Sequence, residues 1–249
     1  MHDSFCSLVF GGSGTLGRVV CRTLSAHGSR LAFTYHTGKV MAAELVAQLP
    51  GSRAMPLDLI SVADIERTVD DAAEALGGLH AFVQCAAVGI TPGDPVRSDS
   101  HQRIEDVGEA SWDYLLSVNL KSTFFACRRL VPHMRRNGGG NIVLVGSIDG
   151  IKPLPSPIHY AASKAALAGM TQSMAKEFGK DNIRVNLVAP GVMEAGISRT
   201  LPPRLLEDYV KHCGSKRVGR LAEVAEVVAW LACDNTYITG QTIVVDGAL

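Results

Sequence analysis

The sequence has no excess of charge of either sign, since its 249 residues include 24 lysines and arginines and 24 aspartates and glutamates. Nucleic-acid-binding domains and membrane-surface proteins usually present a basic surface, so neither partner is expected. No apolar stretch approaches the roughly 20 residues that a membrane-spanning helix needs. The first residues also lack the basic flank and long apolar run of a secretory signal. These absences favour a cytoplasmic protein.

Metal-binding and disulfide patterns are missing as well. The cysteines, at positions 6, 21, 85, 127, 213 and 233, are scattered, with no CxxC pair and no cluster of histidine and cysteine. We therefore expect reduced thiols and no metal site. Because no repeat, low-complexity tract or linker divides the chain, residues 1–249 are expected to form one domain.

Short apolar runs alternate with helical patterns along the whole chain. Strands are expected at 5–10, 31–35, 53–57, 81–85, 142–145, 183–188 and 242–245, and helices at 15–27, 40–49, 62–76, 111–136, 160–178 and 222–232. Strands that are apolar on both faces and separated by helices imply a parallel sheet covered on both sides. Right-handed crossovers then predict an α/β fold, a Rossmann-type doubly wound parallel sheet of about seven strands.

A glycine-rich segment lies between the first strand and the first helix. It reads Gly11-Gly12-Ser13-Gly14-Thr15-Leu16-Gly17. Glycines permit a tight turn and close approach of the backbone to a phosphate, and the helix N-terminus offers free N–H groups. The segment indicates a dinucleotide site. The alternative is a plain turn that packs a helix closely on the sheet.

The end of the second strand favours NADP over NAD. NAD sites usually place an acid here to hold the adenosine ribose, and none occurs before Glu44. The candidates for a 2′-phosphate are Thr34, His36, Thr37 and Lys39. After the third strand, Asp58 either faces the adenine or caps the next helix.

Tyr160 and Lys164 are four residues apart, a spacing that places both on one face of a helix. A lysine charge there favours phenolate and lowers the pKa of the tyrosine. Ser147 follows the apolar run 142–146 and adds a hydroxyl. Together these groups predict proton transfer to a carbonyl oxygen. Taken alone, the pair is more often part of an ordinary amphipathic helix.

With these motifs in order, the chain resembles the short-chain dehydrogenase/reductase family over nearly its whole length. Further matching segments are Ser117-Val118-Asn119-Leu120, Ile183-Arg184-Val185-Asn186, Pro190-Gly191 and Ile238-Thr239-Gly240-Gln241-Thr242. Within the family, residues 160–167, 175–179 and 238–242 are most similar to 3-oxoacyl-acyl carrier protein reductases. Many sugar, steroid and alcohol dehydrogenases carry similar segments.

The resemblance implies a catalytic tetrad. Tyr160 would be the general acid, and Lys164 would lower its pKa and bind the nicotinamide ribose. Ser147 would orient the carbonyl oxygen, and Asn119 would hold a water that links Lys164 to solvent. Val192 would grip the carboxamide. The implied cofactor contacts are Gly11, Ser13, Gly14, Thr15, Leu16, Gly17, Thr34, Tyr35, His36, Asp58, Leu59, Cys85, Ala86, Ala87, Tyr160, Lys164, Pro190, Gly191 and Val192.

Three positions depart from the family pattern. Thr15 replaces the middle glycine of the phosphate loop, and Ala195 replaces a threonine that contacts the carboxamide. The segment Gln84-Cys85-Ala86-Ala87 stands where Asn-Asn-Ala-Gly is usual, so the hydrogen bonding at that strand end must differ. None of these changes removes a catalytic group.

Substrate expectations rest on two segments. Residues 91–110 form a polar loop, either a lid or a surface excursion, and 192–209 resemble the family's mobile substrate loop with apolar side chains at Ile197, Leu201, Leu205 and Leu206. We expect NADPH-dependent reduction of a 3-oxoacyl thioester. The alternatives are a dehydrogenase of small or cyclic secondary alcohols and a catalytically silent nucleotide-binding scaffold.

Two kinds of protein partner are expected. Arg128, Arg129, Arg135 and Arg136 either steer an acidic acyl carrier protein to the site mouth or form a solvated helix end that suits the helix dipole. The family resemblance implies a homotetramer formed through the long helices and the C-terminal strand.

Overall fold

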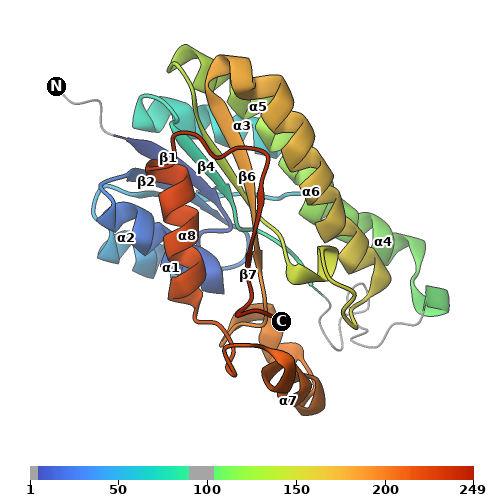
Figure 1. Cartoon of the computed structure of the whole chain (residues 1–249). Helices are drawn as coiled ribbons and strands as arrows, with labels where there is room; N and C mark the ends of the chain where they lie inside the picture. Colours follow the sequence, from blue (N-terminus) through green and yellow to red (C-terminus); the bar gives the residue numbers. More distant parts are fainter. Residues whose placement is uncertain (1–4, 90–103) are drawn as a thin grey trace.

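The computed structural model describes residues 5–89 and 104–249 and shows one parallel sheet between two helix layers (Figure 1). The strand order is β3-β2-β1-β4-β5-β6-β7, and all neighbouring pairs are parallel. The strands are β1 Cys6–Phe10, β2 Arg30–Tyr35, β3 Arg53–Pro56, β4 Ala81–Gln84, β5 Gly140–Val145, β6 Ile183–Pro190 and β7 Thr242–Val245. The order reverses between β1 and β4. Ligands of such sheets bind at this reversal, beyond the carboxyl ends of the strands.

Helices cover both faces of the sheet, as expected. One layer holds α1 Thr15–Ala26, α2 Lys39–Gln48 and α8 Leu221–Cys233; the other holds α3 Val62–Leu76, α4 Glu109–Leu116, α5 Ser122–Arg136 and α6 Ile158–Phe178 (Figure 1). A further helix, α7 Pro203–His212, projects below the sheet beside the C-terminus. The predicted fold class is confirmed.

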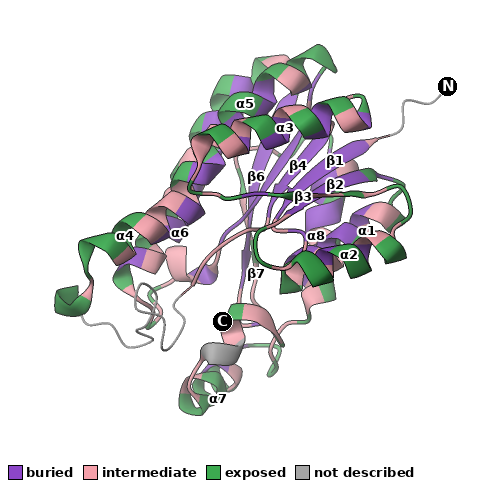
Figure 2. Ribbon diagram, turned by 180° about the vertical axis from the view of Figure 1, so that it is seen from behind, coloured by how far each residue is buried: buried purple, intermediate pink, exposed green. Residues whose placement is uncertain are grey.

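The central strands are buried on both faces, which explains their continuous apolar character (Figure 2). Successive side chains of a strand point to opposite faces. Accordingly, Leu8 and Phe10 pack under α3, α5 and α6, while Val9 packs under α1 and α8. Phe10 and Phe82 meet edge to face with ring centroids 5.0 Å apart. Two separate apolar cores therefore hold the two helix layers on one sheet.

Two predicted segments differ in detail. The single helix expected over 111–136 is observed as α4, a π-helical turn over Ser117–Lys121 and α5. A π-helical turn holds about one residue more than an α-helical turn, and the buried Asn119 lies in it. The expected loop over 192–209 contains a 3₁₀ turn, Gly196–Thr200, and most of α7. Most of the predicted loop over 91–110 lies outside the described residues.

Candidate active site

The predicted catalytic groups meet beyond the carboxyl end of β5. Tyr160 and Lys164 lie in the first two turns of α6, and Ser147 follows β5 directly. The Ser147 side chain lies close enough to the Tyr160 hydroxyl to affect the pKa of the phenol. Lys164 Nζ lies 5.8 Å from the centroid of the Tyr160 ring and donates to the carbonyl oxygen of Val145 at 3.3 Å. A phenol, a hydroxyl and an ammonium are thus gathered at one strand end.

Burial has the largest effect on the pKa values of Tyr160 and Lys164. It raises the pKa of Tyr160 well above its ordinary value; the negative charge of Asp149 adds to this increase, and the Ser147 side chain opposes it. Burial also lowers the pKa of Lys164 to about 8, against the charges of Cys85 and Asp149. Lys164 is not among the groups that shift the pKa of Tyr160 in the protein without its cofactor, so a lowering of that pKa by the lysine stays a prediction.

Asn119 connects two elements of the site. Its Oδ1 accepts the Val88 N–H at 2.9 Å, and its Nδ2 donates to the Val88 carbonyl at 3.0 Å and to Ser163 Oγ at 3.2 Å. The residue is 2% exposed. These contacts fasten the segment after β4 to α6, one residue away from Lys164 in sequence. Asn119 lies in the π-helical turn.

A carboxylate that the sequence interpretation missed lies against Ser147. Ser147 Oγ donates to Asp149 Oδ2 at 2.7 Å and accepts the Asp149 N–H at 3.3 Å. Asp149 is also an electrostatic neighbour of Tyr160 and Lys164. The sequence feature that could have revealed this carboxylate is an acidic residue two positions after the catalytic serine.

Close packing around the glycine-rich loop explains its glycines. A Cβ on Gly17 would lie 2.1 Å from the Gly11 carbonyl oxygen, and one on Gly11 would lie 2.7 Å from Ala86 Cα. Gly14 is the N-cap of α1 and makes no side-chain cap. The first N–H groups of α1 are therefore available to an anion, as a pyrophosphate requires. Ser13 lies in the same loop, and Thr15 and Leu16 are the first residues of α1; Thr15 is exposed and the other two are half-buried.

The segment after β2 differs from the prediction at one residue. Thr34 is 2% exposed and its Oγ1 accepts the Gly11 N–H at 3.0 Å, so it shapes the loop and does not face a 2′-phosphate. A Cβ on Gly38 would lie 3.0 Å from Ser13 Oγ, which places the two loops side by side. Tyr35, His36, Thr37 and Lys39 follow on this partly exposed segment.

Arg18 is a cation near this segment that the sequence interpretation passed over. Its Nη1 lies 3.1 Å from Met41 Sδ, so the guanidinium reaches from α1 toward α2. The glycine-rich loop directly precedes it in sequence. An arginine in this place adds a second positive charge, beside Lys39, to the region that would receive a 2′-phosphate.

Other predicted cofactor contacts occupy neighbouring strand ends. Cys85, Ala86 and Ala87 follow β4 and are half-buried. Burial raises the pKa of the Cys85 thiol to about 12. Asp58 is exposed, and its Oδ1 accepts the N–H of Ile60 at 3.0 Å; Leu59 lies between these two residues. The N-cap of α3 is Ser61, whose side chain accepts a hydrogen bond from the backbone of that helix. The alternative that Asp58 caps this helix is therefore wrong.

The departure at Gln84 has a structural counterpart. Its Nε2 donates to Ser122 Oγ at 3.3 Å and Thr123 Oγ1 at 3.2 Å, while its buried Oε1 has no partner among the residues that the structure describes. The amide thereby fastens β4 to the first turn of α5. That this bonding differs from the usual pattern of the family stays a prediction.

The segment after β6 closes over the strand ends. A Cβ on Gly191 would lie 2.3 Å from Tyr209 Oη, so Pro190 and Gly191 lie against α7. Further on, a Cβ on Gly196 would lie 3.9 Å from Thr15 Cβ, and one on Gly89 would lie 3.1 Å from Ile197 Cγ2. The segment that begins at Val192 and includes Ala195 therefore reaches both the glycine-rich loop and the strand end of β4.

The arginine cluster does not form a free basic patch at the site mouth. Arg128 pairs with Glu66, Arg129 with Asp70 at 2.6 Å, and Arg135 with Asp181 at 2.8 Å. Asp181 precedes β6, so Arg135 lies at the amino ends of the strands, opposite the site. The predicted steering patch is wrong, and the solvated helix end is the better interpretation.

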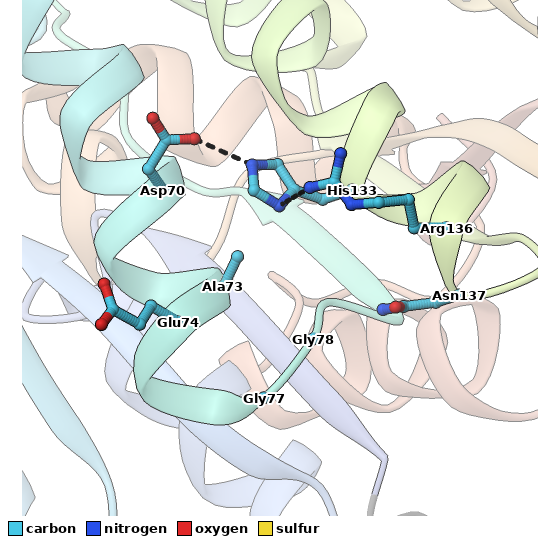
Figure 3. A pocket seen from close by; sticks show the side chains of 8 residues that line it. All are labelled: Asp70, Ala73, Glu74, Gly77, Gly78, His133, Arg136 and Asn137. Carbon is cyan, nitrogen blue, oxygen red and sulfur yellow. Dashed lines mark hydrogen bonds and ion pairs between the residues drawn. The ribbon is translucent and has the colours of Figure 1, made fainter.

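A cavity of about 300 Å³ between α3 and α5 is separate from this site (Figure 3). It is lined by Asp70, Ala73, Glu74, Gly77, Gly78, His133, Arg136 and Asn137. His133 Nε2 lies 2.8 Å from Asp70 Oδ1, and its Nδ1 lies 2.7 Å from Arg136 Nη2, so these polar groups partner one another. None of the predicted site residues lines it.

Two further searches covered only residues 5–89 and 104–249. Within these ranges no helix is both long and apolar enough to cross a bilayer. Nor does this part of the chain gather three or more His, Cys, Asp or Glu side chains as a metal site would.

Comparisons with known proteins agree with this geometry. A family model described as enoyl-(acyl carrier protein) reductase matches residues 12–249. Dehydrogenase/reductase SDR family member 4 of Bos taurus is 33% identical over 98% of this chain and 87% of its own. The crystal structure of a dehydrogenase/reductase from Sinorhizobium meliloti superposes with a TM-score of 0.85 at 28% identity, covering 98% and 94% of the two chains.

Two other relatives differ in coverage. The 3-oxoacyl-(acyl-carrier-protein) reductase FabG of Thermotoga maritima is 43% identical, but over 57% of this chain and 58% of its own. A 3-alpha-(or 20-beta)-hydroxysteroid dehydrogenase of Mycobacterium tuberculosis is 32% identical over 97% and 87%. The chain belongs to the short-chain dehydrogenase/reductase family. It is an oxidoreductase that uses a nicotinamide nucleotide and acts on a small-molecule substrate.

Proposed function

We propose that this protein reduces the 3-oxo group of an acyl thioester, carried by coenzyme A or a carrier protein, with NADPH as the reductant. The observation that carries the proposal is the meeting of Tyr160, Ser147 and Lys164 beyond β5. A raised pKa keeps Tyr160 protonated at neutral pH, the state that an acid catalyst needs.

The residues have separate tasks in this scheme. When bound, the cofactor supplies the hydride that adds to the carbonyl carbon. Tyr160 would give its proton to the carbonyl oxygen, and the Lys164 ammonium would stabilise the phenolate left behind. Ser147 would turn its proton from Asp149 to the same oxygen. Asn119 would keep Lys164 in contact with solvent through a water.

The nucleotide would lie at the carboxyl ends of β1 and β4, where the strand order reverses. The N-terminus of α1 would hold the pyrophosphate, at the loop Gly11–Gly17. Arg18, His36 and Lys39 would receive the 2′-phosphate, which favours NADPH over NADH. Cys85–Ala87 and Pro190–Val192 would enclose the nicotinamide end.

The thioester substrate is supported by the local likeness to FabG and by the apolar side chains after β6, among them Ile197, which is 47% exposed. A second candidate is a dehydrogenase of cyclic secondary alcohols. It is favoured by the hydroxysteroid dehydrogenase relative, whose similarity extends over 97% of this chain. Both candidates use the same catalytic groups.

Following the loss of NADPH absorbance with acetoacetyl-coenzyme A and with cyclohexanone separates these candidates. Faster turnover of the thioester supports the proposal. Turnover of cyclohexanone alone would favour the second candidate. Tight NADPH binding without turnover of either would contradict both and favour a nucleotide-binding scaffold.

Tyr160→Phe is expected to lower the rate of reduction by about 10²- to 10⁴-fold, since the ring stays but the acid is lost. Fluorescence titration should show nearly unchanged NADPH binding. Tyr237→Phe is the matched control, because Tyr237 is 93% exposed and lies outside the site. A Tyr160→Phe variant with near-normal turnover would disprove the assignment of the proton donor.

A further inference from the structure

Asp149 is held rigidly beside the catalytic serine. It lies in the 3₁₀ turn Ile148–Gly150, whose N-cap is Ser147. A Cβ on Gly150 would lie 2.5 Å from the Ala165 backbone nitrogen and 2.6 Å from the Lys164 carbonyl carbon. The turn therefore packs directly on the backbone of α6 next to Lys164. Its position is set by backbone contacts and not by a flexible side chain.

The carboxylate is only partly satisfied within the described residues. Oδ2 accepts from Ser147 Oγ at 2.7 Å, whereas no described residue donates to Oδ1 or forms an ion pair with Asp149. The side chain is half-buried, so it is not a freely solvated surface acid. An ionised carboxylate only accepts hydrogen bonds. The position beside Ser147, next to the Asp149 carboxylate, therefore favours a ligand group that donates a hydrogen bond.

The hydrogen bond to Asp149 also affects catalysis. A hydroxyl has one proton, and Ser147 directs it to Asp149. To bind a carbonyl oxygen, Ser147 must turn that proton away. A simple ketone then leaves the half-buried carboxylate without its donor, which is costly. A substrate hydroxyl could replace Ser147 as that donor and release the serine for the carbonyl.

We propose that Asp149 is a specificity-determining residue that accepts a hydrogen bond from a hydroxyl on the carbon next to the reacting carbon, so that hydroxy ketones are preferred over simple ketones. The inference rests on the proposed ketone reduction at Tyr160. The oxygens of such a hydroxy ketone are close enough for one to lie at Ser147 and the other at Asp149, which are themselves hydrogen-bonded. An unsubstituted 3-oxoacyl thioester has no such hydroxyl, so the inference narrows the proposed thioesters to those that carry a hydroxyl on a carbon next to the 3-oxo group.

The test compares 2-hydroxycyclohexanone with cyclohexanone in the full-length protein with NADPH. The wild type should show a kcat/KM that is about 10- to 100-fold higher for the hydroxy ketone, the effect of one hydrogen bond to a charged group. Asp149→Ala should lower this value for the hydroxy ketone and raise it for cyclohexanone, because no acceptor remains to hold Ser147. Asp149→Asn should shift each value in the same direction as Asp149→Ala but less, since an amide oxygen is a weaker acceptor than a carboxylate. A purely structural role would lower both.

Controls separate the possible failures. Glu177→Gln removes an exposed carboxylate from the same helix as Tyr160 and should leave the ratio unchanged. NADPH titration verifies that each variant is folded. Equal kcat/KM for the two ketones in the wild type, or an unchanged ratio in both Asp149 variants, would overturn the inference while ketone reduction stands. Absence of turnover with both ketones and acetoacetyl-coenzyme A would overturn the proposed function and this inference together.

Discussion

At the scale of single residues, Lys164 combines a positive charge with almost complete burial. It is 3% exposed, and its Nζ has a backbone carbonyl as its neighbour where a carboxylate would stabilise it better. Burial lowers its pKa to about 8 because the charged form loses solvation. The buried position of Lys164 therefore lowers the free energy of unfolding, and it places a cation beside Tyr160.

Lys164→Met should make the protein more stable at pH 6.5, since it removes this buried charge. The pKa of Lys164 is about 8 when folded and 10.5 when unfolded. Between these values the unfolded chain binds more protons, so the wild-type free energy of unfolding rises with pH. The advantage of the variant should accordingly shrink by roughly 2 to 3 kcal/mol between pH 6.5 and 10. Urea unfolding at both pH values measures it.

Lys176→Met is the control for that experiment, because Lys176 is exposed on the same helix. Its stability difference from the wild type should not change over the same pH range. Tyr160 does not disturb the comparison, since it is present in both proteins and its own ionisation, with a pKa that is raised in the folded state only, contributes to both. A pH-independent difference for Lys164→Met would show that the lysine is not desolvated as the structure indicates.

Single residues also show what sequence can predict. Tyr160, Lys164 and Ser147 belong to a recurring pattern, and the structure brings them together. Asp149 and Arg18 were missed because their significance depends on which side chain lies beside them. An acid after a serine is unremarkable until the 3₁₀ turn places both at α6. The structure corrects Thr34 for the same reason, since only the loop contact shows that its hydroxyl is already used.

At the scale of elements, the glycine-rich loop and α1 depend on backbone contact. Gly17→Ala would place a methyl group 2.1 Å from the Gly11 carbonyl oxygen, and a rigid backbone cannot yield as a side chain does. We expect a loss of more than about 2 kcal/mol in the free energy of unfolding, within the range for overpacked sites, and much weaker NADPH binding. Thermal unfolding and fluorescence titration check the two effects.

Gly169→Ala offers a matched helical control. Gly169 is exposed on α6, and nothing lies within 4 Å of its added Cβ. Alanine is the better helix former, so this variant should be more stable by about 0.5 to 1 kcal/mol. Equal effects at the two glycines would contradict the assignment of close contact to Gly17.

Most elements are predictable because each repeats a local pattern. α3 and β7 match their predicted bounds, since Ser61 and Gly77 mark the ends of α3 and β7 is a short apolar run. The π-helical turn is different, because hydrogen bonds of Asn119 to Val88 and Ser163 hold it, and neither partner is near in sequence. Most of α7 was taken for loop because its segment resembles the family's mobile substrate loop, although Pro203 at its start and the spacing of Leu205 and Tyr209 are helical signals.

At the scale of the whole molecule, two apolar surfaces lie on different sides of the domain. On the outer face of α5 and α6, Phe124 and Ile158 are 49% and 54% exposed. At the β7 end of the sheet, Trp230 is 43% and Tyr237 93% exposed, and among the described strands β7 pairs with β6 alone. Apolar side chains grouped on such surfaces usually mark contacts between proteins, and an open strand edge favours pairing with another copy.

We expect these two places to form separate twofold contacts, and two such contacts on one chain give a tetramer, the state that the family resemblance implies. Sedimentation should therefore give a mass of about 106 kDa, four times the 26.4 kDa of the chain. Phe124→Asp should remove one contact and Tyr237→Asp the other, since a buried carboxylate without a partner is costly. Each single variant is expected to be a dimer and the double variant a monomer. A wild-type monomer would contradict the argument, as would a tetramer that survives both changes.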